Sequence, residues 1–155
     1  MSPFLIPKFK EEWMDKFSAH QVINGTWGEI WIDGTYMAEV TAFEAKVTLE
    51  KTDVNMTRRL AKAQKVIGFS CSGQITLNKV SSYFIKKLSD DMKAGRQTVC
   101  TIISKLDDPD AQGAERVVVK DAVFDELTLA NWSAKTLGEE QVSFTFSDWD
   151  LLDTI

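Results

Sequence analysis

The chain has 155 residues, which is enough for one domain with a sizeable core and too few for two. Its composition, 44% hydrophobic and 26% charged, is that of an ordinary globular protein and excludes a disordered or fibrous chain. The formal net charge of −5 argues against tight binding of nucleic acid, which requires clustered cations, although it suits a surface past which nucleic acid moves freely.

The first 21 residues are set apart from the rest as an N-terminal arm. Residues 10–19 predict a short amphipathic helix with Trp13, Met14 and Phe17 on one side. The opening residues lack the apolar core and cleavage site of a signal peptide, and no apolar run approaches the roughly 18 residues of a membrane span. We therefore expect a protein of the cytoplasm with no membrane partner, and a β domain over residues 22–155.

A hairpin opens this domain. Residues 24–28 are rich in turn formers, and a strand over residues 29–32 runs into Asp33-Gly34, a pair typical of two-residue hairpin turns. The chain then continues into a long strand over residues 36–50.

The long strand and its return partner are the centre of the sequence. Even positions are apolar up to Ala42, and odd positions from Phe43 onward, so a bulge near these two residues must turn one face into the other. Fifteen residues reach roughly 50 Å, whereas a chain of this length is about 40 Å across. The strand must therefore bend, change sheet or project, and we expect the change of phase to take it into another sheet near Ala42 and Phe43. The return strand, residues 67–77, alternates cleanly.

A polar, basic loop over residues 51–65 joins the two strands. Loops of this length inside a compact domain are usually functional, and the apolar residues within it offer contacts to a partner. A solvated loop that keeps two strand ends soluble is the alternative. We predict that this loop contacts a partner through Lys51, Asp53, Val54, Met56, Arg58, Arg59, Leu60, Lys62 and Lys65.

The second half predicts one helix and four strands. Ser81 and Ser82 are candidate caps for a helix whose apolar stripe includes Phe84 and Leu88, and Gly95 ends it. Strands are predicted over residues 98–106, 116–124, 126–132 and 141–146, followed by a tail with Trp149, Leu151 and Leu152. The predicted fold is mainly β, with two packed antiparallel β-sheets (a sandwich or partly closed barrel), one flanking helix and a long projecting hairpin loop.

Residues that could carry chemistry are few. His20 is a lone histidine beside a turn, and Cys71 and Cys100 lie on strand patterns, which predicts buried free thiols. Residues 25–28 contain glycines but lack the Lys-Ser/Thr of a phosphate loop. Residues 107–110 contain three aspartates but lack the ligand spacing of a calcium loop. We predict no catalytic, cofactor or metal site. The rival reading is a β-barrel carrier or enzyme whose pocket is lined by Trp27, Trp31, Phe43 and Phe69.

Several stretches together resemble a known family. They are residues 23–29 (INGTWGE), 32–34 (IDG), 73–80 (GQITLNKV), 102–111 (IISKLDDPDA), 113–117 (GAERV), 124–130 (FDELTLA) and 144–146 (FTF). Their order and spacing over roughly residues 22–152 resemble the tail tube proteins of contractile phages and phage-like elements, of the PBSX core tail protein type.

The resemblance implies a structural protein with two packed sheets and a flanking helix. It implies hexameric rings that stack into the inner tail tube, through which DNA passes as cargo or, in bacteriocin-like particles, nothing passes. The loop over residues 51–65 is then expected to be the subunit-stacking loop, which makes the contact between stacked rings or between neighbours within a ring. The implied partners are further copies of the chain and the tail sheath, tape-measure and baseplate proteins, without any cofactor. The implied location is the virion tail, assembled in the cytoplasm of a bacterial host.

Overall fold

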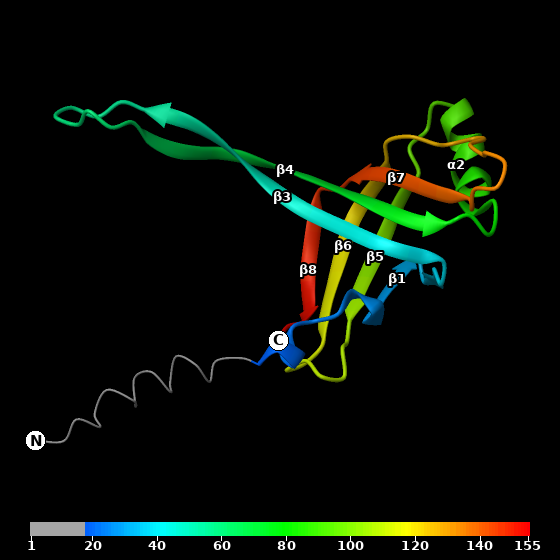
Figure 1. Cartoon of the computed structure of the whole chain (residues 1–155). Coiled ribbons are helices and arrows are strands. Elements are labelled where there is room, and N and C mark those ends of the chain that lie inside the picture. The colour runs from blue at the N-terminus through cyan, green and yellow to red at the C-terminus, as the bar shows by residue number, and fades with distance from the viewer. Residues whose placement is uncertain (1–17) are drawn as a thin grey trace, which may run out of the picture.

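The computed structural model describes residues 18–155 (Figure 1), so most of the predicted N-terminal arm and its helix lie outside the described residues. The fold is mainly β and antiparallel, as predicted. One eight-stranded sheet has the order β2-β1-β5-β6-β7-β4-β3, and β8 pairs with β6. The strands are β1 (Gly28–Ile32), β2 (Thr35–Tyr36), β3 (Val40–Val54), β4 (Ala63–Asn78), β5 (Val99–Leu106), β6 (Glu115–Phe124), β7 (Glu139–Thr145) and β8 (Asp148–Asp153). The described helices are the short 3-10 helices η2 (Ala19–Gln21) and η3 (Gly25–Trp27) and the α-helix α2 (Tyr83–Lys93).

The sheet is folded over itself instead of closing into a barrel. In Figure 1, β3, β4 and β7 cross over β5, β6 and β8, and the core lies between these layers. The largest fully buried side chains are Ile32, Ile75, Phe84, Leu88, Ile102 and Phe144. The predicted packing of two β layers is therefore built from a single hydrogen-bonded sheet.

The first hairpin is as predicted. Trp31 pairs with Tyr36 and Ile32 with Thr35, which leaves Asp33 and Gly34 as the two turn residues. Their φ angles of 49° and 82° are those of a tight turn that requires left-handed backbone at both positions, which Asp and Gly adopt readily.

The predicted change of phase in the long strand is a β-bulge. The register shifts between Val40, opposite Leu77, and Ala42, opposite Thr76, so Thr41 is the extra residue. Val40 and Phe43 both pack against the core as a result. The expectation that the strand changes sheet here is wrong, because β3 stays paired with β4 along its whole length.

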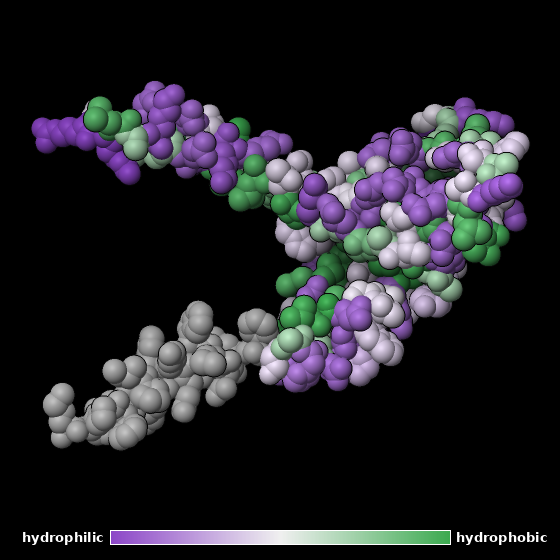
Figure 2. Space-filling view, viewed as in Figure 1, coloured by the Kyte–Doolittle hydropathy of each residue, from purple (hydrophilic) through white to green (hydrophobic). Residues whose placement is uncertain are grey.

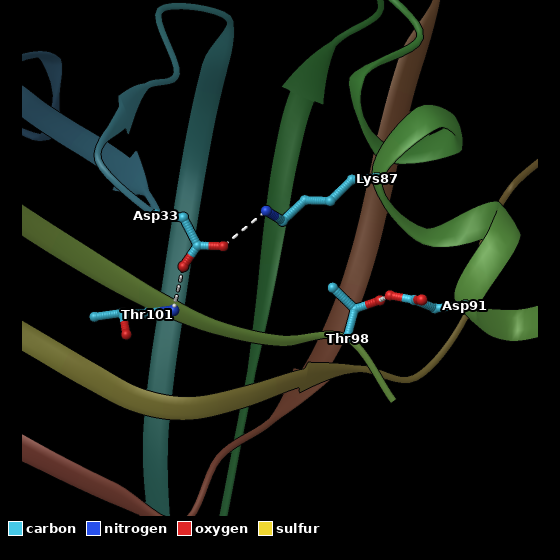
Figure 3. A network of polar contacts seen from close by, with 5 residues as sticks. All are labelled: Asp33, Lys87, Asp91, Thr98 and Thr101. Carbon is cyan, nitrogen blue, oxygen red and sulfur yellow. Dashed lines mark hydrogen bonds and ion pairs between the residues drawn. The ribbon is translucent and has the colours of Figure 1, made fainter. Parts of the chain in front are cut away.

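The helix α2 is predicted correctly, and polar contacts link it to the sheet (Figure 3). Phe84 and Leu88 are buried, and Gly95, with a φ of 73°, follows the helix end. Lys87 donates to the Asp33 carboxylate over 2.7 Å, and the same carboxylate accepts the Thr101 backbone N–H over 2.9 Å. At the other end of the helix, Thr98 donates its hydroxyl hydrogen to Asp91 over 2.6 Å. One carboxylate therefore holds the hairpin turn, β5 and α2 together.

The charges of this contact predict how stability depends on pH. Burial by itself raises the pKa of Asp33, but the hydrogen bonds from Lys87 and Thr101 outweigh burial and leave that pKa below its ordinary 3.8. Burial lowers the pKa of Lys87, and the hydrogen bond to Asp33 outweighs it and leaves the pKa above 10.5. The stabilisation is therefore present between about pH 4 and pH 10. It is lost as the pH falls through the lowered Asp33 value or rises through the raised Lys87 value.

We expect Asp33→Asn to lower the free energy of unfolding by about 1 kcal/mol at pH 7, because the partly exposed ion pair is lost while the turn geometry is kept. Urea unfolding of both proteins at pH 7 and pH 3 measures this, and the two curves should approach each other at pH 3. Asp150→Asn, which removes an exposed contact to Lys120, is the control and should change little. An unchanged gap between the Asp33→Asn and parent proteins at pH 3 would contradict the assignment.

The C-terminal third differs from the prediction in two places. Residues 126–132 are not a strand, since Asp125 donates its N–H to Ser143 at the end of β7 and the chain then leaves the sheet with Leu129 and Trp132 exposed. The tail is a strand, β8, whose Trp149 lies opposite Val119 of β6. β6 pairs with β8 along its first half and with β7 at Val123 and Phe124, and Asp121, with a φ of 55°, lies where the pairing changes partner.

Candidate assembly surface

The two long strands extend beyond the rest of the domain as a ribbon. β7 pairs with β4 from Ser72 to Asn78, so residues 47–54 and 63–71 form a two-stranded extension, which we call the ribbon. Figure 1 shows it projecting away from the body of the domain. An isolated two-stranded hairpin is marginally stable in water, which makes the ribbon a candidate for contact with another molecule.

The predicted stacking loop is shorter than residues 51–65. The strands continue to Val54 and start again at Ala63, which leaves residues 55–62 as the tip. The prediction ended the strands too early because the pairs Thr52 with Lys65 and Asp53 with Gln64 put polar side chains on both faces, so the strands show no alternation just before Val54 and Ala63. Met56, Arg58, Arg59, Leu60 and Lys62 lie in the tip, and Lys51, Asp53, Val54 and Lys65 lie in the strands beside it.

The tip region carries a charge opposite to that of the remaining chain. Residues 51–65 hold five cations and one anion, a net +4, and since the whole chain is −5 the remaining residues carry −9. Lys62 approaches Asp53 at 3.9 Å, and the Arg59 guanidinium approaches the Met56 sulfur at 3.7 Å. Among residues 18–155, neither Arg58 nor Arg59 has a carboxylate within ion-pair distance, and the Leu60 side chain is fully exposed.

The two faces of the ribbon differ in polarity. The cross-strand pair Thr48 with Ser70 and, at the base, Lys46 with Ser72 lie on one face. Val47 with Cys71 and Leu49 with Phe69 lie on the other, which we call the apolar face. Its side chains are 51% exposed at Leu49 and 53% at Phe69, and Ile67, the extra residue of a second bulge opposite Glu50 and Lys51, is 66% exposed beside it. Figure 2 shows hydrophobic side chains in the angle between the ribbon and β8. This face could not be predicted from the sequence because the alternation of residues 67–77 is equally typical of a strand over its own core.

The other residues considered for a metal, phosphate or catalytic site have structural roles or, among residues 18–155, lie without neighbouring residues that would complete such a site. Within the described part of the chain, no group of three His, Cys, Asp or Glu residues is placed to hold a metal ion. The buried Asp108 carboxylate instead accepts the backbone N–H groups of Asn24 and Asp110 and so anchors the start of the domain. Residues 25–27 form η3, capped by Asn24, which is the expected tight turn. His20 lies exposed at the end of η2.

Both cysteines are free and buried, as predicted. Burial, followed by the charge of Asp33, raises the pKa of the Cys100 thiol to about 11. Burial, and then the charge of Asp148, raises the pKa of Cys71. Both sulfurs are therefore protonated near neutral pH, which makes them poor nucleophiles.

The four aromatic residues of the rival carrier reading do not converge on one pocket. Trp31 packs on Tyr36, and Trp27 is half exposed at the chain's turn into β1. Phe43 stacks on Phe144 of the core, whereas Phe69 contacts Trp149 at the base of the ribbon.

The described helices include none long and apolar enough to cross a membrane.

Comparisons with known proteins agree with a structural role. A family model described as phage tail tube protein matches residues 15–153. The phage-like element PBSX protein XkdM of Bacillus subtilis (strain 168) is 35% identical over 135 residues, which cover 86% of this chain and 92% of that protein.

Solved structures share the fold at low sequence identity. The tube-terminating cap of the anti-feeding prophage aligns with a TM-score of 0.69 and 7% identity over 91% of this chain and 97% of that one. A chain of the sheath-tube complex of the extracellular contractile injection system PVC, in its extended state, aligns with a TM-score of 0.64 and 8% identity over 90% of this chain and all of that one. With nearly all of its described length matched by the family model, the chain belongs to the phage tail tube protein family and is a structural subunit instead of an enzyme.

Proposed function

We propose that six copies of this chain close into a ring, and that rings stack into the inner tube of a contractile phage or phage-like tail through which DNA passes. The observation that carries the proposal is the ribbon, because it extends beyond any support from its own chain. Within residues 18–155, β3 pairs with β4 alone, and β4 has no second partner strand before Ser72. Such long unpaired edges are normally covered in a native protein.

The tip is the contact between stacked rings in this proposal. The ribbon carries it beyond the domain, and a +4 tip finds carboxylates on the next ring, since the remainder of each copy carries −9. Ordering a segment costs about 1 to 2 kcal/mol per residue for the backbone alone. We therefore expect the tip to gain order on stacking, as segments that fold on binding do.

The further partners follow from the family and from the assemblies in which similar folds occur. Chains of this fold have been solved within a sheath-tube complex and within a baseplate. By analogy the tube contacts sheath, tape-measure and baseplate proteins, and assembly takes place in the cytoplasm of the bacterial host. The net negative charge of the residues outside 51–65 suits a tube lumen that does not retain DNA.

Negative-stain electron microscopy of the concentrated protein tests the proposal. We expect rings and short tubes, which are visible directly. A lasting monomer that takes up a fluorescent apolar ligand would contradict the proposal and favour the carrier reading.

A further inference from the structure

The apolar face of the ribbon is an extension of the surface that covers the domain's own core. Cys71, at the base of the ribbon, is 7% exposed, whereas Phe69, the next residue on the same face, is 53% exposed. The subunit therefore stops burying this face between these two residues. Phe69 still contacts Trp149 edge-on, at 5.6 Å between ring centroids, and Trp149 contacts Phe146 of the core at 6.5 Å. Farther along the ribbon, Leu49 and the bulge residue Ile67 are more than half exposed within residues 18–155.

A groove lies at the opposite end of the same strand. It has a volume of about 500 Å³ and opens between the start of β3 and the strands β1 and β5. Met37, Val40, Phe43 and Leu106 give it an apolar floor, and its lining also includes Ala38, Glu29 and Lys105. The strand β3 runs 15 residues from this groove to the tip, roughly 50 Å, so the ribbon cannot fold back onto the groove of its own chain.

We infer that the apolar face of one copy's ribbon, around Leu49, Ile67 and Phe69, covers the groove between β1, β3 and β5 of the next copy within a ring. The inference rests on the proposed ring and assigns its lateral contact. A second copy is the occupant because the exposed apolar face and the open groove lie on one chain at opposite ends of one strand, which is the arrangement of a head-to-tail interface that closes by rotation. Charge also favours a second copy, since Lys51 and Lys65, in the ribbon strands beside the tip, are brought toward a body that carries −9.

The assignment separates two levels of assembly. The apolar face makes the contact within a ring, and the tip makes the contact between rings. A change in the apolar face should therefore remove rings, whereas a change confined to the tip should remove stacking and leave rings intact.

The test uses two full-length variants, each with one damaged surface. Ile67→Asp places a charge beside the apolar face, at the second bulge, and Ala38→Trp fills the groove from an exposed position in its lining. Light scattering after size exclusion and native mass spectrometry are run at concentrations at which the unaltered chain forms rings. We expect each variant alone to be a folded monomer. We expect an equal mixture to form a dimer of one copy of each, because one intact ribbon then meets one intact groove and the chain of contacts ends there.

Leu137→Asp is the matched control, because Leu137 is even more exposed than Ile67 and lies in neither surface; it should form normal rings. Rings from Ile67→Asp and from a second ribbon variant, Leu49→Asp, would overturn the inference, as would a mixture of folded variants that remains monomeric. If the unaltered chain never leaves the monomer, the proposed ring fails as well. If the unaltered chain forms rings and the ribbon variants also do, the lateral assignment alone fails.

Discussion

Replacing residues 55–62 by a short Gly-Ser linker is expected to leave folded rings that no longer stack into tubes. The linker closes the same two strands, whose pairing from Val54 with Ala63 inward is untouched, so the subunit keeps its fold. It removes three of the five cations and both exposed apolar side chains of the tip, Met56 and Leu60. Stacking then loses both its charge attraction and its buried apolar area.

Electron microscopy and sedimentation measure this result as the ratio of tubes to single rings. A variant with Arg58, Arg59 and Lys62 replaced by Ala isolates the charge contribution, and we expect its tubes to shorten further as salt is raised. Tubes of normal length from the linker variant would refute the role of the tip. Loss of rings together with tubes would assign the tip to neighbours within a ring.

Gly73→Ala is expected to be the most damaging small substitution in the domain. A Cβ at this position would lie 2.3 Å from the Phe144 ring and 2.4 Å from the Glu44 backbone oxygen, far inside van der Waals contact. Phe144 is fully buried and stacks on Phe43, so it has no free space into which to move. We expect a loss of about 2 to 3 kcal/mol in the free energy of unfolding, the upper part of the usual range for overpacking.

Urea or thermal unfolding of the isolated subunit measures the effect. Gly68→Ala is the control on the same strand, because its Cβ would meet the flexible end of Glu50 at 3.3 Å, which can shift. The two alanines differ in their surroundings and not in the residue introduced. Equal stability of the two variants would contradict the close packing of Phe144 against β4.

The elements that could be predicted from the sequence are those whose residue pattern is set by backbone chemistry or by burial within one chain. Asp33-Gly34 specifies its turn by backbone chemistry alone, and the bulge near Ala42 is required by the change of apolar phase. The helix α2 has an apolar stripe that meets the core at Phe84 and Leu88. In each case the residues that form the signal also make the contacts.

The predictions were wrong where the pattern of apolar residues does not reflect how those residues pack within the subunit. Leu127 and Leu129 alternate as in a strand, yet residues 126–132 pair with no strand of the described chain. The far end of the ribbon lacks alternation because neither of its faces is buried in the subunit, and such a pattern predicts a loop. The apolar face could not be recognised as a surface because an alternating strand looks the same whether its partner belongs to its own chain or to another.

Cryo-electron microscopy of tubes assembled from the unaltered chain tests most directly whether the ribbon makes the contacts that hold the tube together. We expect six copies in each ring, with the apolar face of every ribbon buried against a neighbour and residues 55–62 ordered against the adjoining ring. A map in which the ribbons point into solvent, with Ile67 and Phe69 exposed and the tips free of the next ring, would contradict this expectation.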